Sequence, residues 1–121
     1  MVAARAGLIF VLALAACDAR LPDQDPVTGG NPRRGKELIA QFGCGSCHKI
    51  KGVPGANGSV APPLEDVKKR VYLAGRLPNT PQNLQKWIAN PRSIDPKTAM
   101  PQVGVDAAGA RDIAAYLYAG P

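Results

Sequence analysis

The residues best suited to chemistry in this 121-residue chain are two cysteines and a histidine within the sequence CGSCH at positions 44–48. Two thiols separated by two residues can form thioethers with the two vinyl groups of one haem. A histidine directly after the second sulfur then lies beside the iron as an axial ligand. Gly45 and Ser46 are small, which allows the backbone to pass close to the porphyrin edge. The motif therefore predicts one covalently bound haem c, held by Cys44, Cys47 and His48.

Three other interpretations of the motif meet specific difficulties. A structural zinc site needs four protein ligands, whereas the chain has a single histidine and, besides the motif, only Cys17. A thioredoxin-like redox pair is expected in a βαβ context, which the helical pattern described below does not provide. A disulfide between Cys44 and Cys47 would be strained and would leave the histidine without a role. We therefore favour haem attachment.

The second axial ligand of such a haem follows by elimination. His48 is the only histidine, and Met100 is the only methionine besides Met1. Met100 lies in the proline-rich loop 96–101 (PKTAMP), where no core helix is expected. Two alternatives stay open: a lone methionine is more often core filler, and Lys97 could bind the iron after losing a proton. Ligation by histidine and methionine fills both axial positions and favours ferrous iron, which suits an electron carrier.

Helical signals surround these residues and predict an all-α domain. Two of the expected helices begin with a capping side chain followed by proline, a combination that favours the first helical turn. Apolar residues then recur at helical spacing, and no stretch alternates convincingly between apolar and polar side chains. Long loops in so small a domain usually wrap something. The expected helices cover 32–42, 63–70, the segment from Pro81 to the break at Asn90, and the segment from Asp106 to Gly120, with long loops at 51–62 and 91–105.

Composition and charge limit the classes of partner. Aromatic residues make up only 5% of the chain, a shortage that a buried cofactor would relieve by supplying apolar surface. From Asn31 onward, 13 Lys and Arg residues stand against 6 Asp and Glu residues, a net charge of +7. A domain this basic suits an anionic membrane or an acidic protein face. No dense basic run with interleaved aromatics is present, so we expect no nucleic-acid partner. A surface that merely keeps the domain soluble is the alternative.

The N-terminal residues resemble an export signal. The apolar run 8–16 is too short to span a bilayer but fits the apolar core of a signal peptide. The sequence LAAC at 14–17 resembles a bacterial lipobox, in which the cysteine thiol takes a diacylglyceryl group. The alternatives are an A-x-A cleavage site at 13–15, which would release a soluble periplasmic protein, and an uncleaved anchor. We predict a lipoprotein-type signal peptide over 1–16, a lipidated Cys17 with a flexible tether over 17–31, and a folded domain over 32–121.

Residues 35–119 resemble a class I cytochrome c, and the part from Leu77 to Pro101 is similar to the cytochrome c domain fused to subunit II of caa3-type oxidases. Besides the CGSCH motif, the resemblance depends on LPNTP at 77–81, Trp87-Ile88, Asn90-Pro91 and Met100-Pro101. It implies a small class I cytochrome c-like helical fold wrapped around one haem. The first helix would cross the last, with Gly35 and Ile39 against Tyr116 and Leu117.

The resemblance also implies roles for residues outside the motif. The carbonyl of Pro62 would accept the Nδ1–H bond of His48, which fixes the tautomer and orientation of the imidazole. Thr98 would help to bind a haem propionate. Trp87 would lie against the haem on the methionine side, although core packing explains it equally well. Three further residues fall where propionate-binding groups are expected, with surface charge as the alternative: Arg70, Tyr72 and Arg76.

These observations predict a membrane-tethered carrier of single electrons on the periplasmic side of a bacterial cytoplasmic membrane. We expect a monomeric domain without enzymatic activity of its own. Its partners would be an oxidase, a quinol-oxidising complex or a dehydrogenase with an acidic docking face, contacted by Lys49, Lys51 and Lys97. A fixed haem relay subunit of a larger complex is one alternative. A small-ligand sensor or catalyst is another, although no second histidine or acid/base pair near the motif supports it.

Overall fold

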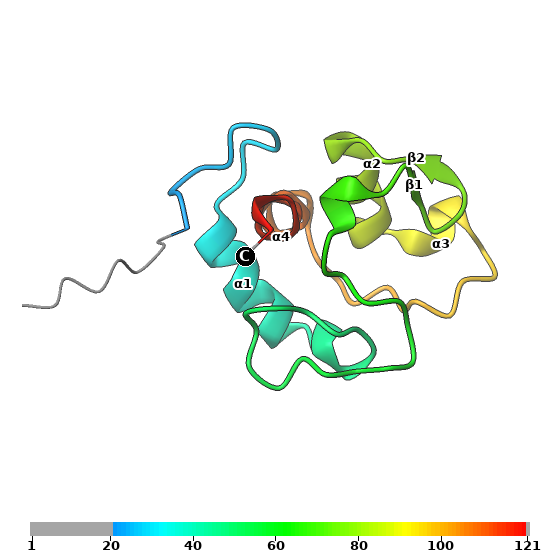
Figure 1. The fold of residues 1–121 in the computed structure, drawn as a ribbon. Coiled ribbons are helices and arrows are strands. Elements are labelled where there is room, and N and C mark those ends of the chain that lie inside the picture. The colour runs from blue at the N-terminus through cyan, green and yellow to red at the C-terminus, as the bar shows by residue number, and fades with distance from the viewer. Residues whose placement is uncertain (1–20, 121) are drawn as a thin grey trace, which may run out of the picture.

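The computed structural model describes residues 21–120, so the predicted signal peptide and Cys17 lie outside the described residues. Most regular structure in this range is helical, as the sequence predicts (Figure 1). Strands β1 and β2 form a minimal antiparallel hairpin, which is too short to show an alternating pattern in the sequence. The elements are α1 (Pro32–Gln41), η1 (Cys44–Ser46), η2 (Val67–Lys69), β1 (Tyr72–Leu73), β2 (Leu77–Pro78), α2 (Pro81–Ala89), α3 (Pro91–Ile94) and α4 (Ala107–Ala119), where η is a 3₁₀ turn.

The three longer helices begin where local side chains satisfy their free backbone donors. Asn31 Oδ1 accepts from a backbone N–H of the first turn of α1 at 3.1 Å, and Thr80 Oγ1 does the same for α2 at 3.1 Å. Asp106 Oδ1 accepts from Gly109 N at 2.7 Å at the start of α4. At the other end of α4, Gly120 adopts the left-handed conformation, with φ of 62°. The helix boundaries predicted from these caps are confirmed.

Helices α1 and α4 cross at close range, and this crossing organises the core. A Cβ atom at Gly35 would lie only 1.9 Å from the carbonyl oxygen of Asp112, so the two backbones leave no room for a side chain there. Ile39 on α1 and Tyr116 on α4 are each 1% exposed, and Leu117 is buried beside them. This is the crossing that the resemblance implies, and Figure 1 shows the two helices against each other.

The segment predicted as a helix over 63–70 is mostly irregular. Only η2 is helical there, because Asp66 adopts a left-handed conformation with φ of 62°, which an α-helix does not tolerate. The residues predicted to face inward still do so: Val67 is 2% exposed, and Leu64 packs against the core. The predicted loop 91–105 differs too, since it begins with the single helical turn of α3.

Part of the segment predicted as a flexible tether is folded. The carboxylate of Asp25, 5% exposed, accepts hydrogen bonds from the backbone N–H of Thr28 at 2.6 Å and from its hydroxyl at 2.8 Å. A Cβ atom at Gly30 would lie 2.4 Å from the carbonyl oxygen of Arg111, so this turn rests directly on α4. Asn31 N then donates to Asp112 Oδ1 at 2.9 Å. The folded part of the chain therefore begins before α1.

Between residues 21 and 120, no helix combines the length and the apolar character that crossing a bilayer requires.

Candidate haem site

The cysteine motif lies directly after α1, on a turn that Gly43 initiates. Gly43 is left-handed, with φ of 70°, and turns the chain from the end of α1 into η1. Cys44 and Cys47 are half-buried, and both are free thiols rather than a disulfide. Burial raises the pKa of the Cys44 thiol; a hydrogen bond of its own backbone opposes this effect, and the neighbouring Cys47 adds to it. Two unpaired thiols are what thioether formation requires.

The loop that follows the motif packs on the motif itself. Gly58 N donates to Gly45 O at 3.0 Å, and Ala61 N donates to Cys47 O at 3.0 Å. A Cβ atom at Gly58 would lie 2.4 Å from the carbonyl carbon of Cys47. A Cβ atom at Gly45 would lie 2.6 Å from Cα of Ala56. The long loop thus wraps the motif, and the structure gives Gly45 a packing reason to be small besides the predicted approach to a porphyrin.

His48 is oriented by a backbone carbonyl. Its Nδ1 lies 2.6 Å from the carbonyl oxygen of Pro62, the contact that the resemblance implies. When Nδ1 donates its proton to this oxygen, the neutral ring carries its lone pair on Nε2. A ring held in this way presents one defined nitrogen to a metal.

Met100 lies in a loop that is ordered by a threonine. Met100 N donates to Thr98 Oγ1 at 3.2 Å, which leaves the threonine hydroxyl proton available to another acceptor such as a propionate. Within the described residues, Met100 is half-buried and is not a member of the hydrophobic core. This placement argues against core filling as its role.

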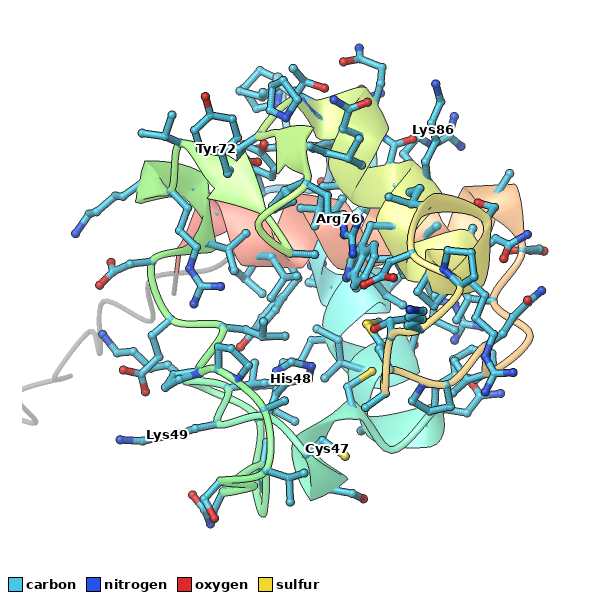
Figure 2. The ribbon with its side chains drawn as sticks, turned by 90° about the vertical axis from the view of Figure 1, so that its right-hand side faces the viewer. Cys47, His48, Lys49, Tyr72, Arg76 and Lys86 are labelled. Atoms are coloured by element: carbon cyan, nitrogen blue, oxygen red, sulfur yellow. The ribbon has the colours of Figure 1, made fainter. Side chains whose placement is uncertain are left out.

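The four remaining predicted residues have different surroundings. The guanidinium of Arg70 donates to the carbonyl of Pro63, beside the turn that holds His48. Arg76 lies near a carboxylate of the methionine loop, 3.4 Å from Asp95 Oδ1. Tyr72 is 61% exposed, and Trp87 on α2 is half-buried. In Figure 2, Tyr72 and Arg76 come from the upper part of the face shown, and Cys47 and His48 from the lower part.

Two residues that organise the site were not predicted from the sequence. Asn79 Nδ2 donates to the carbonyls of Val67 and Arg70, each at 2.8 Å. Asp95 contacts Arg76 and also accepts a hydrogen bond from Lys97 N at 3.1 Å. Asp95 precedes a proline, and that pair is a signal for turn initiation. Nothing in the local sequence marks Asn79 as the partner of two distant carbonyls.

The donor set of these residues fits a haem c. The chain offers two free thiols at the required spacing, an imidazole with one nitrogen held by Pro62, and a thioether on an ordered loop. Over residues 21–120, no group of three or more His, Cys, Asp and Glu side chains is placed to hold a metal ion. Methionine is not one of these residue types, so the finding does not concern an iron held by His48 and Met100. It bears only on sites of the zinc type.

A small helical domain with a CxxCH motif and a separate methionine loop has the arrangement of a c-type haem protein. The family model for cytochrome c matches residues 32–119, and the chain belongs to the cytochrome c family. Membership of this family implies a covalently bound haem c and haem-based electron transfer.

The chain is also similar to cytochrome c oxidase subunit 2 of Alkalihalophilus pseudofirmus. The two sequences are 31% identical over 68 residues, which cover 56% of this chain and 19% of that relative. The match therefore spans about a fifth of the relative's length.

Proposed function

We propose that this protein carries single electrons on one haem whose iron ligands are His48 and Met100. The 2.6 Å contact between His48 Nδ1 and the Pro62 carbonyl is the observation that best supports this proposal. It suits a histidine that binds iron through Nε2, because Nδ1 is already engaged and the ring cannot readily exchange protons through it. The haem, when bound, supplies the one-electron redox couple.

The other residues of the site hold and shield the cofactor. Cys44 and Cys47 would carry the two thioether bonds. Thr98 orders the loop of Met100 through its hydroxyl oxygen, and its hydroxyl proton is free to donate to a propionate. Arg70 and Tyr72 would lie towards the propionates, and Trp87 would pack on the methionine side of the ring. With both axial positions filled, no site for a small substrate remains at the iron.

We further propose that Cys17 carries a lipid that holds the domain at the outer face of the cytoplasmic membrane. The LAAC sequence supports lipidation, and the similarity to an oxidase subunit supports a place at a membrane. Leu21 already packs against the core, and Asp23 pairs with Arg33. The chain from Cys17 to Leu21 can therefore span at most about 13–15 Å when fully extended. The domain would operate close to its membrane.

The proposed partners have acidic docking faces, and a terminal oxidase is the proposed acceptor. Lys49, Lys51 and Lys97 are exposed on a domain with a positive net charge. Lys49 lies 3.7 Å from Glu65, so part of its charge is balanced within the protein. The similarity to oxidase subunit 2 also favours a second candidate, a fixed haem relay within an oxidase complex. Co-purification with an oxidase in mild detergent would support the relay, and isolation alone would support the shuttle.

The carrier function is tested by mass spectrometry and redox titration of protein matured in a host that attaches haem c. We expect the added mass of one haem and a single one-electron transition. Cys47→Ala should lose the normal two-thioether attachment. Cys17→Ser should keep the haem and release the protein from membranes, which separates the anchor from the redox site. A protein without haem, or one that turns over peroxide as fast as a peroxidase, would contradict the proposal.

A further inference from the structure

The tip of the β hairpin contacts the loop that carries Met100. Between β1 and β2, the chain turns through the left-handed residues Ala74 and Gly75, which leaves Arg76 at the tip. Arg76 Nη2 lies 3.4 Å from Oδ1 of Asp95, the residue that follows α3. The side chain of Asp95 is only 18% exposed, compared with 55% for Arg76. The carboxylate is therefore held between the hairpin and its own loop.

Asp95 is the first member of a series of hydrogen bonds that ends at Met100. Its backbone N–H donates to Pro91 O at 2.9 Å, which closes α3, and its Oδ1 accepts from Lys97 N at 3.1 Å. Its carbonyl accepts from Thr98 N at 3.0 Å. Thr98 Oγ1 then accepts from Met100 N at 3.2 Å. Asp95 thus holds the backbone of Lys97 and Thr98, and Thr98 holds the backbone of Met100.

We propose that Arg76 and Asp95 are positioning residues for Met100: their ion pair joins the hairpin to the loop and keeps the thioether at the iron. This inference rests on the proposed function, because it requires Met100 to be a ligand. It also assigns Arg76 a role different from the propionate binding that the resemblance implies. Neither residue would touch the iron, and both would act through the backbone of the loop.

The consequence is a measurable resistance of the iron to foreign ligands. An added ligand such as cyanide must displace Met100 before it binds ferric iron, so its apparent affinity depends on how firmly the loop holds the methionine. Loss of a partly exposed ion pair changes such an equilibrium by up to about fivefold. Arg76→Gln and Asp95→Asn should therefore each raise cyanide affinity about three- to fivefold.

The test is a cyanide titration of the ferric haem protein in four forms: wild type, Arg76→Gln, Asp95→Asn and the double variant. The amide oxygen introduced at position 95 can still accept from Lys97 N, so the substitution removes chiefly the charge contact. If the two residues act through each other, the double variant should match either single variant. Lys86→Gln is the matched control, because Lys86 is exposed on α2 and no ion pair to it is found over residues 21–120. It should leave cyanide affinity unchanged.

Three results would overturn the inference. Arg76→Gln alone could raise cyanide affinity while Asp95→Asn has no effect, which would indicate propionate binding by Arg76. Alternatively, the effects of the two substitutions could add. Urea unfolding of each variant measures global stability, which distinguishes a local effect on the loop from a general loss of stability. A change in cyanide affinity that merely follows the loss of global stability would also contradict the proposed role of the ion pair. Failure of the proposed function looks different, because the wild-type ferric protein would then lack the long-wavelength methionine–iron absorption band.

Discussion

The hydroxyl of Tyr118 donates a hydrogen bond of 2.6 Å to Oδ1 of Asn79, which ties the end of α4 to the segment that leads into α2. Through Nδ2, Asn79 also holds the carbonyls of Val67 and Arg70. One amide thus joins the last helix to the stretch that carries Arg70. Burial, and to a smaller extent the charge of Asp25, raises the pKa of the Tyr118 phenol, so the neutral donor form predominates at neutral pH.

Tyr118→Phe should lower the free energy of unfolding by about 1 kcal/mol, because Asn79 Oδ1 loses its donor in a partly buried position. Urea unfolding followed by circular dichroism measures the change. Val60→Ala is the control: Val60 is 83% exposed, and its substitution should change stability by less than about 0.5 kcal/mol. Equal effects of the two substitutions would show that the contact with Asn79 does not stabilise the fold.

Gly58→Ala should impair haem attachment. The new methyl group would lie 2.4 Å from the carbonyl carbon of Cys47, so either the loop or the motif must move. Overpacking of this kind typically costs about 1–3 kcal/mol. The measurement is the fraction of purified chain that carries haem, with Ser59→Ala, an exposed neighbour, as the control. Full attachment in both variants would mean that the loop does not need its close approach to the motif.

Charge reversal at Lys49, Lys51 and Lys97 should slow electron transfer to an acidic acceptor at least about tenfold at low ionic strength and should flatten the dependence on salt. Stopped-flow reoxidation of the reduced protein measures both quantities. Arg111→Glu provides the control, because Arg111 is exposed on α4 beside the N-terminal turn. Unchanged rates and an unchanged salt dependence in the triple variant would refute the assigned docking surface.

The helices that could be predicted from the sequence are those whose ends are set locally. Asn31, Thr80 and Asp106 are capping residues within their own first turns, and Gly120 ends α4 by its own conformation. The predicted helix over 63–70 does not form because Asp66 adopts a left-handed conformation, which cannot be predicted from the residue type alone. Propensity is a weak guide where tertiary contacts decide the backbone.

The chemistry of the site follows from a short motif, whereas its support comes from residues far apart in the chain. Cys44, Cys47 and His48 are adjacent, so spacing alone indicates their use. The contact between Arg76 and Asp95 and the turn of Asp25 against α4 depend on packing between separate elements. No periodicity records such pairings, which is why the sequence predicts a flexible tether where Asp25 is in fact buried.

The most direct test of the central claim is a carbon monoxide difference spectrum of the reduced, purified haem protein. Ligation by both His48 and Met100 leaves no open position at the iron, so we predict no spectral change on the addition of carbon monoxide. A prompt shift of the Soret band would contradict this ligation. It would mean that the iron is open or exchanges its ligand readily, and that the protein binds small molecules rather than only carrying electrons.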